Sequence, residues 1–285
     1  MKKILHCRTS LLLVGLLLTF VVGCKKETDN ATPAIETVCQ LERLTDKVNG
    51  SYRRYTYDAT GLMTASTYYG KDLTSSTSKL TYTAQGLLDR YAYGTGEYEQ
   101  YSYVNGALSK IEIFLKDNKG ALKPAYRYDV TTNTSKQITE MKSTDLTADA
   151  QFYNYSSKFN YDSQGRCTKI ATFDDGMPFD VSEFSDFELT AKPEFTAWKG
   201  IPIQVATSFL NYGTAVPLSG YAQHRSFKYQ YAYDDNGKFV GLKPYSSSSY
   251  AYKLNSRQYV TEWSGSDNAT QKVVATNAFQ YNNCN

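Results

Sequence analysis

Pairs of tyrosines separated by one residue recur along this chain, and this spacing constrains its fold more than any other feature. Successive side chains of a β-strand point to opposite faces, so two tyrosines at this spacing lie on the same face. No comparable stretch keeps the 3.6-residue apolar period of an amphipathic helix. The spacing therefore predicts an all-β protein. The pairs are Tyr55/Tyr57, Tyr91/Tyr93, Tyr101/Tyr103, Tyr126/Tyr128, Tyr153/Tyr155 and Tyr250/Tyr252, with the triple Tyr229/Tyr231/Tyr233.

These pairs belong to an internal repeat that joins a strand to a tight turn. In the clearest copies an aspartate and then a glycine follow the second tyrosine, as Asp58 and Gly61 follow Tyr57. The aspartate can accept hydrogen bonds from the turn backbone, and the glycine supplies the positive φ of a bulged hairpin. The residue two positions past the glycine is apolar in every copy, and the residue five positions past it is apolar at Ile111, Ile170 and Leu242. Because two and five differ in parity, this pattern requires a β-bulge or burial on both faces. Copies begin at Tyr55, Leu80, Tyr101, Phe159 and Tyr231, with degenerate copies at Tyr126 and Phe279.

Repeated hairpins in one compositional unit predict a single β domain over residues 39–285. We expect the hairpins to pair in succession as one long, twisted and curled antiparallel sheet. The repeat leaves two outcomes open, an open sheet and a closed barrel.

The N-terminus predicts a lipoprotein signal peptide over residues 1–23. Three basic side chains precede an apolar run at 11–22, and these 12 residues are too few for a helix to cross a bilayer, which takes about 20. Val21-Val22-Gly23-Cys24 places a small residue before a cysteine, as a lipobox does. We expect cleavage before Cys24 and its acylation, which would anchor the chain to a membrane. The alternative is an ordinary secretory signal.

Residues 24–38 are polar, contain Pro33 and lack any helical or strand period, so they predict a flexible tether. The charged run at 25–27 resembles the export signal of surface lipoproteins in Bacteroidetes-type bacteria. It implies a lipid-anchored outer-membrane protein that faces the cell exterior. A plain charged linker, with the protein on the periplasmic face, is the alternative.

The charge balance argues against a nucleic-acid partner. The whole chain has 31 basic and 28 acidic side chains, but residues 1–23 hold three basic and no acidic ones, which leaves 28 of each sign. A nucleic-acid-binding surface needs a basic face or stripe. We therefore expect no nucleic acid among the partners.

Three cysteines remain when Cys7 is removed with the signal and Cys24 is acylated. Cys39 and Cys284 bracket the β domain, and a disulfide between them would join its ends in an oxidising envelope compartment. Cys167 occupies the apolar slot of the repeat, which predicts a buried and unreactive thiol.

The repeat, the lipobox and the framing cysteines together resemble a known family. The pattern Tyr-x-Tyr-Asp-x-x-Gly-x-apolar, repeated between residues 50 and 285, resembles the YD-repeat-like lipoproteins of Bacteroidetes-type bacteria and, more distantly, the longer YD repeats of RHS-type proteins. Those longer repeats build a spiralling β-shell, so the resemblance implies a curled sheet and supplies no catalytic residues. The chain departs from the pattern at Gly106, which comes one residue early, and in the copy at 129–158, which lacks its glycine.

Residues 174–222 break the repeat and contain four of the seven prolines, Trp198 and several phenylalanines. Such an excursion either covers an open end of the sheet as an apolar cap or carries a ligand-binding site. Tyrosine rings on a sheet face likewise either complete a thin core or stack on sugars. Trp198, Tyr229 and Tyr231 are the candidate ligand-binding residues.

Catalytic signals are weak. His224 is the only histidine of the mature chain, so we expect no metal site, and no nucleotide-binding or calcium-binding motif points to a cofactor. A Cys167/His224 or serine/His224 pair lacks a surrounding nucleophile motif. The acidic pairs Asp174/Asp175, Asp234/Asp235 and Glu183/Asp186 leave glycoside hydrolysis as an alternative.

The sequence thus predicts a monomeric, membrane-anchored lipoprotein without enzymatic activity, which binds a ligand or acts structurally in the envelope. A glycan or another envelope protein is the expected partner. Glycan binding and glycoside hydrolysis are the more specific alternatives.

Overall fold

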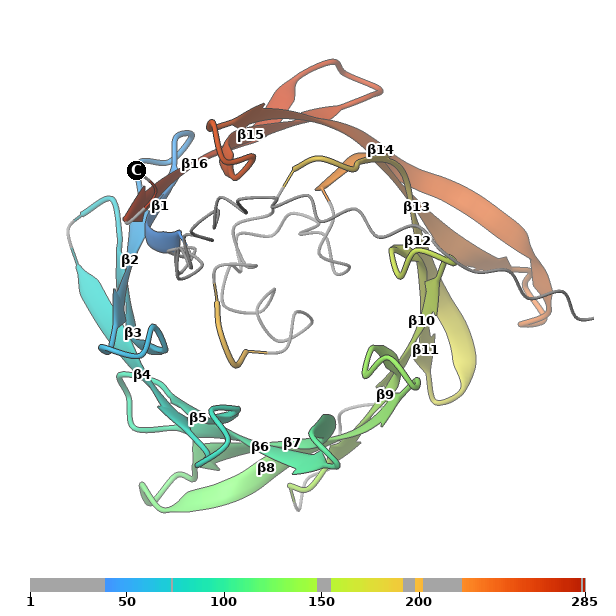
Figure 1. Ribbon diagram of the computed structural model, residues 1–285. Coiled ribbons are helices and arrows are strands. Elements are labelled where there is room, and N and C mark those ends of the chain that lie inside the picture. The colour runs from blue at the N-terminus through green and yellow to red at the C-terminus, as the bar shows by residue number, and fades with distance from the viewer. Residues whose placement is uncertain are drawn as a thin grey trace, which may run out of the picture. The chain divides into compact units, whose positions relative to one another are not determined.

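The computed structural model describes residues 39–72, 74–147, 155–191, 198–201, 222–282 and 284. Sixteen antiparallel strands form a closed barrel in which each strand pairs with its sequence neighbours and β1 pairs with β16 (Figure 1). The expected all-β fold is confirmed, and the sheet closes. The strands are β1 (Gln40–Asp46), β2 (Tyr52–Tyr57), β3 (Met63–Tyr69), β4 (Ser75–Tyr82), β5 (Leu88–Ala92), β6 (Tyr98–Val104), β7 (Ala107–Lys116), β8 (Leu122–Thr132), β9 (Ile138–Asp145), β10 (Tyr155–Tyr161), β11 (Cys167–Asp174), β12 (Met177–Glu188), β13 (Ala222–Tyr233), β14 (Phe239–Leu254), β15 (Val260–Asp267) and β16 (Val273–Asn282).

The barrel belongs to a compact unit that spans Thr37–Asn285. The predicted signal peptide at 1–23, the lipid-attachment residue Cys24 and the tether at 24–38 lie outside the described residues. Within the described ranges, no helix is long and apolar enough to cross a bilayer.

The repeat's aspartate closes its turn as the sequence predicts. The Asp58 Oδ1 accepts hydrogen bonds from the amides of Thr60 and Leu62 at 2.8 and 3.0 Å, and Gly61 adopts a φ of 83°. The pKa of Asp58 is lowered by hydrogen bonds from the Thr60 hydroxyl and the Leu62 amide. The same pair of hydrogen bonds, from the backbone amides two and four residues later to the side-chain oxygen, recurs at Asp117, Asn133, Asp162, Asp234 and Asn255.

A β-bulge follows most of these turns and resolves the conflict in the apolar pattern. Between β2 and β3, Thr56 pairs with Ala65 but Tyr57 pairs with Met63, so Thr64 is an extra residue. An extra residue reverses the parity beyond it, which lets apolar side chains two and five positions past the glycine share one face. The predicted bulge is confirmed, and it recurs at the β4–β5, β6–β7, β8–β9, β10–β11, β13–β14 and β14–β15 hairpins.

The repeat's second tyrosine joins each hairpin to the one before it. The Tyr82 hydroxyl donates to the backbone carbonyl of Met63, the apolar residue that follows the preceding turn. Equivalent bonds, all between 2.6 and 2.8 Å, run from Tyr57 to Leu41, Tyr103 to Leu88, Tyr161 to Ile138, Tyr252 to Gln223 and Tyr281 to Val260. Because these hydroxyls satisfy backbone carbonyls, most of the tyrosine pattern serves the fold.

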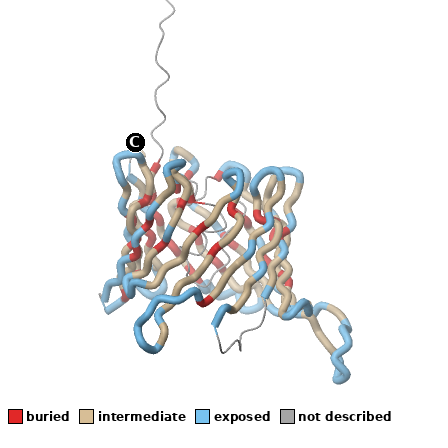
Figure 2. Tube along the Cα trace, turned by 90° about the horizontal axis from the view of Figure 1, so that it is seen from below, coloured by how far each residue is buried: buried red, intermediate tan, exposed pale blue. Residues whose placement is uncertain are grey.

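The two faces of the wall differ in character. Tyr55 is 4% exposed and packs against Trp198, and the segment Trp198–Ile201 lies inside the ring of strands (Figure 1), so Tyr55 faces the interior. The flanking Arg54 and Thr56 are exposed and face outward. The same alternation continues around the barrel, with buried positions spaced along the wall (Figure 2). Buried apolar and aromatic side chains thus line the interior, whereas charged side chains occupy many outward positions beside the stacked pairs Tyr52/Tyr69 and Tyr98/Phe114.

A disulfide joins Cys39 and Cys284, the pairing that the sequence suggested, with Cα atoms 4.8 Å apart. It lies where β1 begins and β16 ends, at what we call the C-terminal rim; the β2–β3 and β4–β5 turns share that rim. Cys167 is a free, buried cysteine, and burial raises the pKa of its thiol to about 11. The predicted burial of Cys167 is confirmed, and its lack of reactivity stays a prediction.

Two sequence expectations need correction in their details. The degenerate copy at Tyr126–Asp129 does not end in a turn: these residues lie inside β8, and the turn follows at 133–136. The non-repeat range 174–222 is also broader than the true excursion. Met177–Glu188 continue the sheet as β12 and Ala222 opens β13, because their backbones complete antiparallel ladders despite the missing repeat signature.

Candidate functional site

The connection between β12 and β13 brings a short segment into the barrel. Trp198 and Ile201 are 4% and 7% exposed. The Trp198 ring lies 5.2 Å from the Tyr55 ring, tilted by 54° to it. The described part of the excursion thus fills interior space beside β2. The rest of the excursion, at 192–197 and 202–221, lies outside the described residues, and the predicted cap stays a prediction.

Backbone contacts hold this segment near the turns of the C-terminal rim. The Gly200 carbonyl accepts a hydrogen bond from the Leu88 amide at 2.9 Å, and the Lys199 Nζ donates to the Thr60 carbonyl at 3.4 Å. Gly200 has a φ of +77°, and a Cβ there would lie 2.1 Å from the Gly86 carbonyl oxygen. Only a glycine at position 200 lets the two backbones come this close, so any other residue there would disturb the contact.

Among the described residues, the Glu99 carboxylate lies among interior tyrosines. Glu99 on β6 accepts hydrogen bonds from the Tyr93 and Tyr101 hydroxyls. Burial, and then the charge of Glu99, raise the pKa of both tyrosines well above the usual range. Raised pKa values keep these hydroxyls protonated, so they act as hydrogen-bond donors to the carboxylate.

A groove opens on the barrel wall where β9 and β10 separate. These strands pair only from Lys142 with Ser156 to Glu140 with Lys158. Beyond that point β9 stays with β8 and β10 stays with β11. The Ser143 hydroxyl bridges the gap by donating to the Tyr155 carbonyl at 3.0 Å. A side-chain bond thus replaces the backbone ladder, and the wall is open to solvent there.

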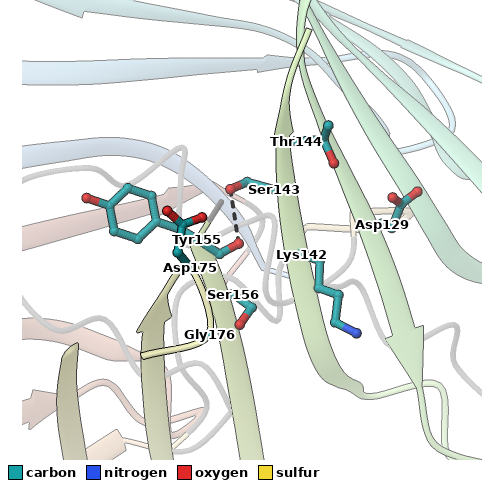
Figure 3. Close-up of a pocket in the computed structure, with 8 residues that line it drawn as sticks. All are labelled: Asp129, Lys142, Ser143, Thr144, Tyr155, Ser156, Asp175 and Gly176. Atoms are coloured by element: carbon teal, nitrogen blue, oxygen red, sulfur yellow. Dashed lines mark hydrogen bonds between the residues drawn. The ribbon is translucent and has the colours of Figure 1, made fainter. Parts of the chain in front are cut away.

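The groove has a volume of about 600 Å³ and a mixed polar lining. In Figure 3, Tyr155 and Asp175 lie on one flank, and Thr144, Asp129 and Lys142 lie on the other. Carboxylates and hydroxyls accept hydrogen bonds, the ammonium donates them, and the Tyr155 ring is 40% exposed. This chemistry suits a polyhydroxylated ligand. The lining residues are Asp129, Lys142, Ser143, Thr144, Tyr155, Ser156, Asp175 and Gly176.

The three candidate ligand-binding residues do not form one site. Trp198 lies in the interior against β2, whereas Tyr229 and Tyr231 lie on β13 and pair with residues of β14. Sequence reasoning also missed the groove. The groove arises where the β9–β10 ladder ends at Lys142 and Ser156, and no repeat feature marks those two residues.

The candidate catalytic groups have structural partners. Glu183 pairs with Lys169 at 3.2 Å, and Asp186 pairs with Arg225 at 3.1 Å. The His224 Nδ1 lies 2.9 Å from the Tyr250 carbonyl and 26 residues from it in sequence, so that ring is fixed by β14. In the described ranges, no three His, Cys, Asp or Glu side chains gather as metal ligands would.

Comparison with known proteins identifies the fold. No protein-family model and no curated protein matches the chain. A porin-like protein from Bacteroides uniformis ATCC 8492 superposes with a TM-score of 0.52 at 14% identity, over 84% of this chain and 96% of that one. A porin-like protein from Bacteroides vulgatus ATCC 8482 also gives 0.52, at 11% identity, over 86% and 99%. At these identities the likeness shows a shared barrel fold, and membership of the YD-repeat-like lipoproteins stays a prediction.

Proposed function

We propose that this chain is a lipid-anchored barrel of the cell envelope, which stands in water and binds a ligand without converting it chemically. The observation that carries the proposal is the set of charged pairs on the outer face of the barrel. The two similar structures are porin-like proteins, which agrees with an envelope or outer-membrane setting. Acylation at Cys24 and exposure on the cell surface are the finer parts of the proposal.

A barrel that crosses a membrane needs an outward apolar band about 25 Å tall. Here charged pairs occupy the outer face within the strands. Lys110 and Glu112 flank the buried Ile111 and pair at 2.8 Å; Lys253 and Glu262 pair across β14 and β15 at 2.6 Å. Arg127–Asp129, Lys142–Glu140 and Lys169–Glu183 continue the pattern. Placing such pairs in hydrocarbon is unfavourable, so the exterior favours water.

Replacing the acylated cysteine tests this proposal directly. We expect an alkaline carbonate wash to release the Cys24→Ser chain from the membrane fraction, because its wall cannot hold it in a bilayer. The acyl groups should be absent from its intact mass. Retention of Cys24→Ser in the membrane after high-salt and carbonate washes would instead identify a membrane-spanning barrel.

The groove between β9 and β10 favours a glycan as the ligand. Its hydroxyls, two carboxylates and one ammonium match the alternating donors and acceptors of a sugar, and Tyr155 offers a ring for stacking. We expect saturable binding of the unacylated mature chain on a glycan array. Lys142→Ala combined with Asp129→Asn should weaken that binding by roughly tenfold or more, the loss of one or two charged hydrogen bonds.

The matched control is Lys253→Ala, which removes an exposed lysine from the same outer face on β14. It should leave glycan binding unchanged. Equal loss in both variants would point to nonspecific charge effects, and an array without any saturable signal would remove the glycan proposal while leaving the anchored-barrel proposal intact.

A further inference from the structure

The hairpin of β13 and β14 extends beyond the barrel wall at the rim opposite the disulfide (Figure 2). β12 pairs with β13 only as far as Asp180 with Gln230, and β15 meets β14 only from Ser248 onward. Residues 231–247 therefore include a two-stranded projection around the turn at Asp234–Lys238. We call this projection, with the adjoining start of β12, the flap.

Large apolar side chains are concentrated on the flap and exposed to solvent. Phe239 occupies the repeat's apolar slot, which is buried in the other clear copies, yet it is 49% exposed. Tyr231 and Tyr233 pack around its ring at 5.4 and 6.1 Å. The exposed group comprises Met177 at 57%, Phe179 at 49%, Phe239 at 49%, Val240 at 62%, Leu242 at 42% and Tyr245 at 68%. A concentration of this kind marks an interaction surface.

We propose that the flap is a membrane-contact element, which inserts its apolar side chains into the interfacial region of a phospholipid bilayer. Aromatic and aliphatic side chains beside lysines are the composition that binds at this interface. Lys238 and Lys243 are exposed next to the apolar group, and their ammonium groups can reach the headgroups while their stems cover apolar surface.

A second copy of the chain fits the exposed apolar surface of the flap less well than a bilayer does. Large side chains cover 150–250 Å² when fully buried, so six that are about half exposed offer roughly 500 Å². A stable protein interface takes about 800 Å² from each partner. A fluid bilayer needs neither that area nor a complementary shape, which a convex hairpin with bulges at Val240 and Tyr245 does not offer.

The charge of the flap selects the lipid. Lys238 and Lys243 are outnumbered by Asp180, Asp234 and Asp235, so the element gains little from an anionic surface. Asp234 is already engaged with the amides of its own turn and can stay among the headgroups. The expected target is a zwitterionic bilayer. This argument is independent of acylation at Cys24, which only raises the local concentration of lipid.

Flotation of the unacylated Cys24→Ser chain with phosphatidylcholine vesicles tests the proposal. We expect the protein to float with the vesicles, with little change between low and high salt. Phe239→Ser combined with Leu242→Ser should lower the partition coefficient about tenfold, because two apolar anchors are lost. Both side chains are exposed, so thermal unfolding should stay near that of the parent chain.

The control is Leu122→Ser, which removes an equally exposed leucine, at 45%, from β8 outside the flap. It should float like the parent. The proposal is overturned if the parent chain does not float, or if the double variant floats as well as Leu122→Ser. It is also overturned if the parent is a dimer by light scattering that the double variant dissociates, since a second copy would then be the occupant.

Discussion

Replacing Cys39 and Cys284 together by alanine is expected to lower the free energy of unfolding by about 4 kcal/mol. The disulfide closes a loop with a sequence separation of 245 residues, and chain entropy assigns the largest stabilisation to long loops. It also sits where the first and last strands meet, so its loss acts on the seam of the barrel. Urea unfolding of the double variant against the parent chain measures the difference.

Cys167→Ala is the matched control for that measurement. This residue is a buried cysteine without a disulfide, so its replacement tests packing alone and should destabilise by about 1 kcal/mol. Intact-mass analysis after alkylation without reductant should find one free thiol in the chain of residues 25–285. Three free thiols would show that the disulfide does not form, and equal destabilisation by the control would assign the effect to packing.

Gly200→Ala is expected to displace the interior segment Trp198–Ile201 from the wall. The added Cβ would meet the Gly86 carbonyl oxygen at 2.1 Å, a distance that no rotamer can relieve, and the φ of +77° adds backbone strain. The Leu88–Gly200 hydrogen bond would break, and Trp198 would leave Tyr55. Measured in a Trp263→Phe background, Trp198 fluorescence should shift to the red and become accessible to iodide.

Gly120→Ala separates the effect of backbone strain from the effect of the steric clash. Gly120 has a φ of +81°, but its Cβ would meet nothing within 4 Å. This control carries the strain of about 1 kcal/mol without the clash, and it should leave Trp198 fluorescence unchanged. A Gly200→Ala protein whose Trp198 stays blue-shifted and protected from iodide would show that the segment is not held by this contact.

The local parts of the fold could be predicted from the sequence because their causes are local. Asp58 specifies a turn by its hydrogen bonds, and Gly61 does so by its positive φ. The changed parity of the apolar residues beyond the glycine predicts the bulge. Closure could not be predicted, since it depends on β1 meeting β16 across nearly the whole chain. An open spiral and a barrel use the same repeat.

The candidate site was harder to predict for the same reason. Trp198 was recognised as unusual, but its neighbours Tyr55 and Tyr57 come from a strand about 140 residues earlier. The groove arises from a ladder that stops between β9 and β10, which no residue in the groove announces by itself. The exposure of Phe239 likewise follows from where β12 and β15 end, whereas its own repeat copy resembles the buried ones.

Because β1 pairs with β16, the closing ladder of the barrel must form last during folding. Every other ladder joins neighbours in sequence, so these contacts have low contact order and can form while the chain is still emerging. The final ladder must wait for the last residues. Until then the sheet has two open edges, and open edges recruit other strands. A chain of this design is therefore most prone to aggregation in the interval before its C-terminal strand is available.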